Sequence, residues 1–416
     1  MALTVRGAGG MSAFPKQLAI TTKPTKTSYK AGESLDLTGL VTTVTYSDDS
    51  TEVVTTTPSM TTGTVIYEDT SSVTLSWTWP DDTDVTLAVD LPISVTRVLT
   101  GIAMKAPTKT TYYKGDTLNL AGATVTATFN SGKTADVTRS TTFSPANGTK
   151  LSSFGTQTIT ATYTENGVSK TASTSVKITV KTVTWANGSD SEIVDMVAAA
   201  DAGVIKLSDY WAVGDTRTIS LSAMSATGVG ESQAAQTQKF VLMNVGGKTL
   251  SNGRTCSFVV GMKNCLHTNG YMNSSSTNSG GWEKCARRTW CNNVFYKAIP
   301  SAIRPIFKQF KNVTASGTGS STTTSTDYFA LPSEKEIFGT TTYADGTAES
   351  ANRQFAWYKT SANRIKYDEG TSNAWWYWER SPYSSNSNYF CFVNGNGSAD
   401  CSTAGYHNAL SPFGCI

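Results

Sequence analysis

The stretch YWERSPYSSNSNYFCFVNGNGSADCSTAGYHNALSPFGCI, residues 377–416, decides how the C-terminal part of this chain folds. Two framework blocks, residues 378–382 and 410–416, enclose residues 383–408, which are mostly Ser, Asn, Tyr and Gly. The apolar run 390–393 (Phe-Cys-Phe-Val) interrupts this polar tract. A linker has no reason to carry such a run, so the tract predicts a folded surface with a strand beneath it.

The composition of residues 383–408 favours molecular recognition. Tyr offers a large contact area with few rotatable bonds, and Ser, Gly and Asn offer adaptable hydrogen bonding, as in antibody paratopes. The only formal charge is Asp400, so the tract makes a poor nucleic-acid surface. The alternative, a loop with no partner, is disfavoured because an aromatic run precedes the tract and an apolar block follows it.

The whole-chain numbers exclude several classes of protein. A chain of 416 residues predicts two to four domains, and a net charge of +3 indicates no polyanionic partner. No apolar run is long enough to insert into a membrane. The N-terminal residues lack the apolar segment of a secretory signal. Either a signal has been removed, or the protein is folded in a cytoplasm and released by another route, such as lysis.

An internal repeat occupies residues 18–181. The segment 24–27 (Pro-Thr-Lys-Thr) recurs at 107–110, and the offset of 83 residues persists without a gap. The matched positions are Tyr29 with Tyr112, Gly32 with Gly115, Leu35 with Leu118, Leu37 with Leu120, Gly39 with Gly122, Tyr46 with Phe129, and Val54 with Val137. Short alternating apolar runs separated by small polar turns predict a β-sandwich in each copy.

The repeated pattern K-x-x-Y-x-x-G-x-x-L-x-L-x-G resembles the bacterial immunoglobulin-like domains of surface and phage proteins. That resemblance implies spacers or weak adhesins with no catalytic residues. The expected domains are an N-terminal arm at 1–17, Ig-like domains at 18–98 and 99–181, a linker with a short helix at 182–205, and a third domain at 206–416.

Local signals suggest several elements after the repeat. Ser191 is the expected cap of the junction helix, and Gly203 its stop. Residues 287–313 have helical spacing, interrupted by prolines, and predict two helices. Ser333 and Glu336 form an expected capping box, and residues 315–326 an expected surface loop. Strands are expected at 218–221, 239–243 and 257–260.

Seven cysteines lie at or after Cys256, with no closely spaced pair of the kind that binds zinc. We interpret them mostly as buried free thiols, and one or two disulfides stay open as an alternative. His267 and His407 are isolated in the sequence. We therefore predict no metal, no cofactor and no catalytic residues.

The third domain carries a series of blocks in fixed order. They are 281–282 (GW), 288–290 (RTW), 331–336 (LPSEKE), 378–382 (WERSP), 390–393 (FCFV) and 412–416 (PFGCI). This series resembles an uncharacterised domain family of phages and gut bacteria. It is also similar to the C-type lectin fold of formylglycine-generating enzymes and to the variable proteins of diversity-generating retroelements. The implied fold is α+β and C-type-lectin-like, with ligand contacts near the C-terminus of a rigid scaffold.

Carried onto this sequence, the resemblance implies a set of ligand-binding residues: Tyr377, Tyr383, Ser385, Asn386, Asn388, Tyr389, Phe392, Asn394, Asn396, Ser398, Asp400, Ser402, Tyr406, His407 and Asn408. It implies framework roles for Trp378, Arg380, Phe390, Val393, Phe413 and Cys415. The family pattern commonly has Leu where this chain has Glu379, so the side that Glu379 faces stays open. The aromatic run 375–378 could stack on a sugar, although a core role is the more common one.

The sequence as a whole predicts a mainly β protein of two Ig-like sandwiches and a C-type-lectin-like domain. We expect a phage virion adhesin, or a prophage relative, that binds a bacterial surface protein or glycan through a retroelement-diversified surface. Expected partners include other virion proteins and further copies of the chain, with no nucleic acid. The expected location is the virion, or alternatively the bacterial cell surface. Two alternatives stay open: a capsid or tail decoration protein, and a formylglycine-generating-type oxidase using Cys391 or Cys401.

Overall fold

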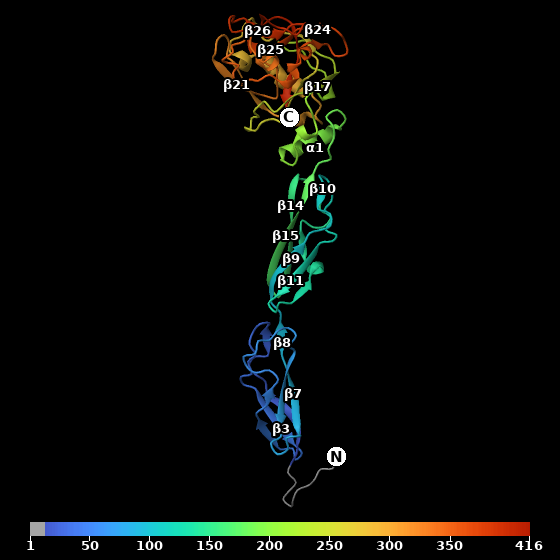
Figure 1. Cartoon of the computed structure of the whole chain (residues 1–416), viewed down its shortest axis with the longest axis vertical. Helices are drawn as coiled ribbons and strands as arrows, with labels where there is room; N and C mark the ends of the chain where they lie inside the picture. Colours follow the sequence, from blue (N-terminus) through green and yellow to red (C-terminus); the bar gives the residue numbers. More distant parts are fainter. Residues whose placement is uncertain (1–12) are drawn as a thin grey trace, which may run out of the picture. The chain divides into compact units, whose positions relative to one another are not determined.

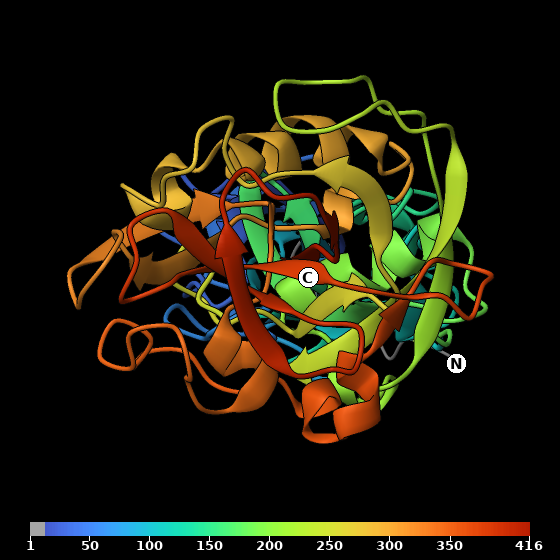
Figure 2. The same cartoon turned by 90° about the horizontal axis from the view of Figure 1, so that it is seen from above.

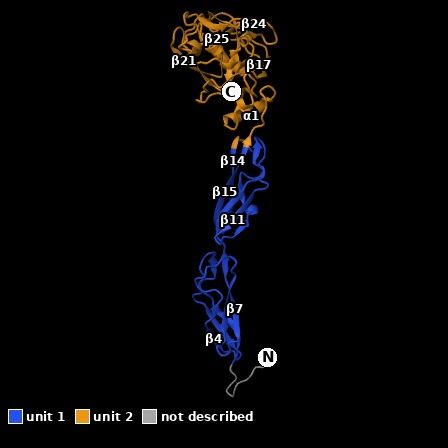
Figure 3. Cartoon of the chain, in the orientation of Figure 1, with its two compact units in different colours: residues 1–151, 156–177 blue, residues 152–155, 178–416 orange. Residues whose placement is uncertain are grey.

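The computed structural model describes residues 13–416, except for the side chains of 267–269. It divides into two compact units, coloured separately in Figure 3. Unit 1 holds the residues up to 151 together with 156–177, and unit 2 holds 152–155 and 178–416. The expected arm lies mostly outside the described residues, but its last part was placed wrongly, because strand β1 already begins at Pro15.

The first Ig-like copy is built from short strands, of which Figure 1 labels β3, β7 and β8. Their bounds are β1 Pro15–Thr22, β2 Ser28–Lys30, β3 Val41–Tyr46, β4 Thr51–Val54, β5 Thr57–Pro58, β6 Ser72–Thr78, β7 Thr86–Pro92 and β8 Ser94–Thr96. The sheet β1-β3-β4 and the sheet β5-β6-β7 supply the two layers, and β2 pairs in parallel with β8. Alternating side chains meet between the layers, as in Val73 and Leu75 of β6, which are fully buried.

The second copy repeats this arrangement. Its strands are β9 Leu99–Lys105, β10 Thr111–Tyr113, β11 Thr124–Phe129, β12 Thr134–Asp136, β13 Thr142–Ser144, β14 Gly155–Glu165 and β15 Val168–Thr179, with a 3₁₀ turn at Thr138–Ser140. They form the sheets β12-β11-β9 and β10-β15-β14-β13. Val125, Ala127 and Phe129 alternate into the core along β11, as the period of two predicts.

A buried tyrosine fastens the same turn in each copy. The hydroxyl of Tyr29 donates to the carbonyls of Lys26 and Asp36 at 2.9 and 3.0 Å. The equivalent Tyr112 hydroxyl donates to the carbonyls of Lys109 and Asn119 at 3.2 and 3.0 Å, and accepts the N–H of Asn119. The repeated Tyr therefore marks a structural anchor in both domains.

Unit 2 begins with helix α1, Asp190–Asp201. Its cap is Ser189 rather than the expected Ser191, because the Ser189 hydroxyl accepts the N–H of Glu192 while the Glu192 carboxylate accepts the N–H of Ser189. The helix ends at the expected place, with Gly203 in the left-handed region at φ 72°.

Two five-stranded sheets form the body of unit 2. The first has the order β16-β17-β18-β29-β22, and the second β19-β28-β25-β26-β27. Their bounds are β16 Thr216–Leu221, β17 Gln236–Val245, β18 Phe258–Met262, β29 Phe413–Cys415, β22 Phe329–Ala330, β19 Leu266–Gly270, β28 Asn408–Leu410, β25 Tyr377–Pro382, β26 Tyr389–Val393 and β27 Ala399–Thr403. Figure 2 shows the C-terminal strands, in red, on the side of unit 2 nearest the viewer.

The segment expected to form two helices is shorter and more varied. It contains α2 Gly281–Lys284, α3 Ala286–Trp290, a π-helical turn at Cys291–Phe295, α4 Tyr296–Ala298 and a 3₁₀ turn at Arg304–Ile306. Strand β20, Phe310–Ala315, replaces the end of the second helix, and β21, Thr322–Asp327, replaces half of the expected loop. The Thr-rich β21 suits a strand because β-branched side chains pack well on a pleated surface.

Smaller elements complete unit 2. They are α5 Glu334–Phe338, β23 Lys366–Tyr367, β24 Ala374–Trp375 and 3₁₀ turns at Leu207–Asp209, Ala356–Lys359 and Ser361–Arg364. The capping box expected at Ser333 and Glu336 opens α5. Among the described residues, no helix is long and apolar enough to cross a membrane.

Tyr112→Phe tests the anchor in the second copy. The variant leaves the N–H of Asn119 and two carbonyls without the hydroxyl, so we expect the free energy of unfolding to fall by about 1–3 kcal/mol. Urea denaturation followed by fluorescence measures it. Tyr113→Phe is the matched control, because the neighbouring Tyr113 is 53% exposed. An equal loss in both variants would argue against the anchor.

Candidate ligand-binding surface

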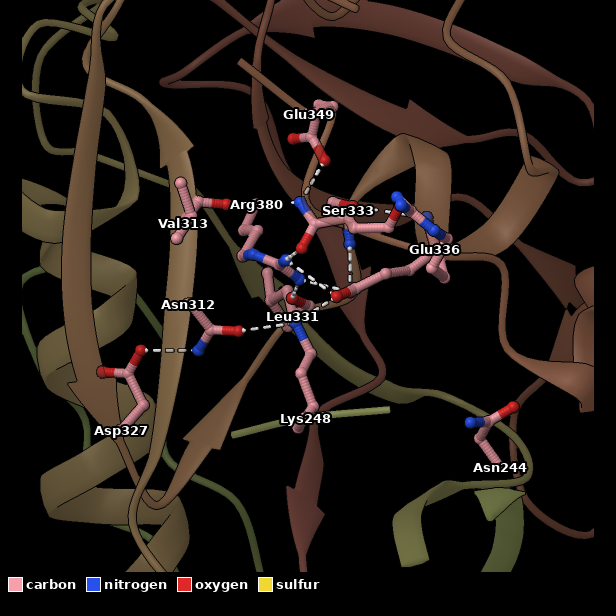
Figure 4. A network of polar contacts seen from close by, with 12 residues as sticks. Asn244, Lys248, Asn312, Val313, Asp327, Leu331, Ser333, Glu336, Glu349 and Arg380 are labelled. Atoms are coloured by element: carbon pink, nitrogen blue, oxygen red, sulfur yellow. Dashed lines mark hydrogen bonds and ion pairs between the residues drawn. The ribbon is translucent and has the colours of Figure 1, made fainter. Parts of the chain in front are cut away.

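A buried charge cluster holds strand β25 in place. The guanidinium of Arg380 contacts both carboxylate oxygens of Glu336, one of them at 2.9 Å, and the ammonium of Lys248 contacts the same carboxylate (Figure 4). All three residues are at most 6% exposed. They come from the loop after β17, from helix α5 and from β25, so the cluster fixes three distant segments against one another.

The cluster also sets the protonation of its members. Burial alone would raise the pKa of Glu336, but Arg380 and Lys248 lower it to about 2. Burial lowers the pKa of Lys248, and the Glu336 carboxylate opposes that effect. Glu336 is therefore ionised at neutral pH, and its stabilising contribution is lost only as the pH falls from about 4.5 toward 2.

A chain of hydrogen bonds extends the cluster toward β20 and β21. The ammonium of Lys248 donates to the side-chain carbonyl of Asn312 at 3.1 Å, and the Asn312 amide donates to the carboxylate of Asp327 at 2.9 Å. Asp327 also accepts the indole N–H of Trp282 at 3.0 Å and the guanidinium of Arg288. Two of the ordered sequence blocks of the third domain, 281–282 and 288–290, thus meet at the carboxylate of Asp327.

On its other side the cluster reaches Ser381. The guanidinium of Arg380 donates to the side-chain oxygen of Asn352, and the side-chain amide of Asn352 donates to the carboxylate of Glu349. The Ser381 hydroxyl donates to Glu349 at 2.8 Å and accepts the N–H of Glu334 at 3.0 Å. The blocks 331–336 and 378–382 are therefore joined through buried polar groups as well as through packing.

Glu379, whose side the sequence left open, faces the core. It is fully buried, and neither carboxylate oxygen has a hydrogen-bond partner among the described residues. Burial, with Glu334 and Glu349 adding to it, raises the pKa of Glu379 well above its usual 4.5. Burial thus favours the neutral acid of Glu379, at a position where the family pattern commonly has Leu.

Strands β26 and β27 form a hairpin over this framework. Their register pairs Tyr389 with Thr403, Phe390 with Ser402, Cys391 with Cys401, Phe392 with Asp400, and Val393 with Ala399. Residues 390–393 are buried, whereas every residue of β27 is half-buried. The hairpin is therefore anchored through β26 and turns β27 and its loops toward solvent.

The structure divides the fifteen predicted contact residues by exposure. The exposed ones are Ser385, Asn388, Asn396, Ser398, Tyr406 and His407. The half-buried ones are Tyr383, Asn386, Tyr389, Asn394, Asp400 and Ser402. All twelve belong to β26, β27 or the loops that flank them, between residues 383 and 407.

Three predicted contacts are wrong, because Tyr377, Phe392 and Asn408 are at most 3% exposed. Tyr377 and Asn408 lie on β25 and β28, which are interior strands of their sheet, and the Tyr377 hydroxyl donates to the carbonyl of Arg364. Phe392 packs against Trp376 and Trp378, with ring centroids at 5.6 and 6.0 Å. The six residues expected to be framework are all buried.

Sequence reasoning missed the residue that holds the loop 383–389. The buried amide nitrogen of Asn278 donates to the carbonyls of Tyr383, Asn386 and Tyr389 at 3.2, 2.9 and 2.9 Å. The backbone N–H of Asn278 donates to the carbonyl of Ser387 at 2.7 Å. The loop is thus held mainly by its main chain, which leaves Ser385, Ser387 and Asn388 exposed.

Two aromatic side chains outside the predicted set border the surface. Trp376 is 44% exposed, and its ring stacks near Tyr406 at 6.3 Å between centroids. Tyr343 meets Tyr383 edge-on at 5.6 Å. The aromatic run 375–378 is therefore split, with Tyr377 and Trp378 in the core and Trp376 outward.

Among the described residues, no group of His, Cys, Asp or Glu is arranged to hold a metal ion. The side chain of His267 lies outside the described residues. All seven cysteines are free; six are buried, and Cys401 is half-buried. Burial raises the pKa of Cys391 well above its usual value, so its thiol is a poor nucleophile at neutral pH.

Comparison with known families identifies the repeat but leaves unit 2 without an assigned role. Residues 22–76 and 106–180 match the bacterial Ig-like domain family (group 3), and residues 258–413 match a domain of unknown function (DUF6273). No curated protein matches the chain. Domains 1–6 of the surface-layer protein SbsC are 15% identical over 60% of this chain and 38% of that one, with a TM-score of 0.18, too low to bear on fold or function.

Glu336→Gln tests the charge cluster. The substitution leaves Lys248 and Arg380 buried without a compensating charge, so the free energy of unfolding should fall by about 3–5 kcal/mol at pH 7. Lys239→Gln is the control, because its ammonium lies 3.9 Å from Glu369 and is half exposed; it should cost less than about 1 kcal/mol. Similar losses in a urea titration would contradict the role given to Glu336.

Glu379→Gln tests the buried neutral acid. Because the folded pKa of Glu379 lies above its usual value, unfolding releases a proton above about pH 4.5, and wild-type stability declines as the pH rises from there. The variant lacks this decline, so its stability relative to wild type should be greater at pH 7 than at pH 4. Thermal unfolding at both pH values measures it, with Glu283→Gln as the control for a half-buried carboxylate. A relative stability that does not change with pH would show that Glu379 ionises normally.

Proposed function

We propose that unit 2 is the recognition head of a phage virion adhesin, or of a close prophage relative. It binds a molecule of the bacterial surface through the exposed side chains between residues 383 and 407, without catalysis. The observation that carries this proposal is the separation of roles along the tract. Buried groups such as Asn278 and Phe392 hold its backbone, while Ser385, Asn396 and Tyr406 face solvent.

The proposed head has the C-type-lectin-like architecture and the retroelement-diversified surface that the sequence blocks suggest. Support comes from the polar composition of the outward residues and from their placement over a core of Trp378, Phe390 and Arg380. Exchange of solvent-facing side chains on such a scaffold changes stability little. A surface of this kind suits repeated replacement of its contact residues.

The chemistry of the surface favours a ligand without strong charge. Asp400 is the only formal charge in the tract, and aromatic rings of Trp376 and Tyr406 border it. Rigid aromatic anchors among small polar groups give contact area and adaptable hydrogen bonds. A neutral glycan or a protein loop of the bacterial surface fits these properties.

Unit 1 is proposed to act as a spacer. Its two Ig-like copies have cores of their own, and their matched residues anchor turns. Further copies of the chain on a virion would add avidity to weak individual contacts. The same arrangement would serve on a bacterial cell surface, the alternative location.

A surface-exchange variant tests the proposal. Ser385, Asn388, Ser398 and Tyr406 are replaced together by Ala, while the turn-forming Asn386, Asn394 and Asn396 are kept. We expect an unchanged thermal midpoint and at least about a tenfold loss of binding to bacterial cells that adsorb the labelled wild-type protein.

The matched control replaces Thr318, Ser320 and Ser321, which are exposed on the turn between β20 and β21. It should bind like wild type. Equal binding by the surface-exchange variant, across a panel of strains and a glycan array, would rule out the 383–407 surface as the recognition site.

A further inference from the structure

Two of the seven cysteines face each other across the hairpin of β26 and β27. Cys391 of β26 pairs directly with Cys401 of β27. Directly paired residues of an antiparallel ladder project from the same side of the sheet. The two thiols therefore share one side of the hairpin, below the turn 394–398.

The hydrogen bonds at the two ends of the hairpin locate this pair in the ladder. The N–H of Asn394 donates to the carbonyl of Ser398 at 2.9 Å, and the N–H of Ala404 donates to the carbonyl of Asn388 at 2.8 Å. Hydrogen-bonded and non-hydrogen-bonded pairs alternate along an antiparallel ladder. Cys391 is three residues from both Asn388 and Asn394, so it occupies a non-hydrogen-bonded pair.

That position suits a covalent bond. In a non-hydrogen-bonded pair the Cα atoms lie about 4.5 Å apart, closer than in the hydrogen-bonded kind. A disulfide accepts Cα separations of about 4.4–6.8 Å. The backbone of the hairpin therefore needs little movement to let the two sulfur atoms bond.

Solvent exposure also distinguishes this pair of cysteines from the other five. Cys401 is half-buried and can meet a reagent from solvent, while Cys391, opposite it on β26, is fully buried. The other five cysteines are all buried, including Cys256 and Cys415, whose thiols interact with each other. Only at 391–401, within the described residues, does an accessible thiol have a second thiol directly opposite.

We propose that Cys391 and Cys401 are a disulfide-forming site, closed when the protein leaves a reducing cytoplasm and meets a small-molecule disulfide. The Cys401 thiolate attacks one sulfur of the oxidant, breaking its S–S bond and releasing one thiolate. The Cys391 thiolate then attacks the sulfur of Cys401, forming the protein disulfide and releasing the second thiolate. Two electrons pass to the oxidant, and the two thiol protons pass to its two thiolates.

The chemistry has a pH dependence. Burial, with Asp400 and Glu334 adding to it, raises the pKa of Cys401, and burial raises that of Cys391, with Glu334 and Glu349 adding to it. Because the thiolate is the attacking species, closure should be slow at pH 7 and accelerate as the pH rises.

Closure would stiffen the display surface. The bond would join the two strands that carry the loops 383–388 and 394–398, and limiting their motion would reduce the entropy lost on binding a ligand. This consequence rests on the proposed function, whereas the disulfide itself does not.

Oxidised glutathione is the probe for the bond. The folded full-length protein is incubated with it between pH 7 and 9, the remaining thiols are blocked under denaturing conditions, and the chain is cleaved beside Asp400 and Tyr406. Cleavage there separates Cys391, Cys401 and Cys415 unless a disulfide joins them. We expect a Cys391–Cys401-linked peptide, loss of two blockable thiols, and five cysteines still free.

Two variants keep the test sharp. Cys391→Ser should stop at a mixed disulfide between Cys401 and glutathione, and Cys401→Ser should leave all thiols free. Cys265→Ser is the control and should form the linked peptide as wild type does. If folded wild type yields no linked peptide up to about pH 9, ends at the mixed disulfide, or links Cys256 to Cys415 instead, the proposal is overturned.

Binding to adsorbing cells is measured separately with the reduced and oxidised protein. The proposal expects tighter binding by the oxidised form and reversal by a dithiol reductant. A disulfide that forms without changing binding overturns the stiffening consequence alone. Absence of cell binding in both forms counts against the proposed function and leaves the disulfide result standing.

Discussion

A carboxylate sealed between two cations is the constraint on which unit 2 depends. An ion in the core is tolerated only when its partners are in place, because the cost of removing it from water is otherwise several kcal/mol. Glu336, Lys248 and Arg380 must therefore come together whenever the domain folds. Their meeting positions β25, and β26 and β27 then continue the sheet from β25. The surface formed by β26, β27 and their loops is therefore built on β25.

Much of this organisation could be predicted from the sequence. The unbroken offset of 83 residues identified two equivalent domains, because Tyr29 and Tyr112 make the same contacts in each. The capping box at Ser333 was predictable because its two hydrogen bonds depend on residues three apart. The apolar run 390–393 was predictable as a strand because nothing in the polar tract around it competes for the core.

The errors have physical causes. Tyr377 and Asn408 look like surface residues by type, but both lie on interior strands whose neighbours cover them, and strand order is a long-range property. Phe310 has helical spacing with the residues before it, yet it pairs with Asp327 in a hairpin. Asn278 gave no signal at all, since its partners lie more than a hundred residues later in the chain. Local patterns cannot report contacts of that range.

The grip of Asn278 on the loop has an evolutionary consequence. Its amide nitrogen bonds to backbone carbonyl oxygens, which every amino acid possesses. These hydrogen bonds therefore do not depend on the side chains of the residues whose carbonyls accept them. Exchange of the side chain at Tyr383 or Tyr389 leaves these acceptor oxygens in place, so the scaffold tolerates mutational drift at these two positions. Exchange at Asn386 also removes the side-chain oxygen that accepts the N–H of Asn388. The same indifference makes this loop a natural place to build a combinatorial library.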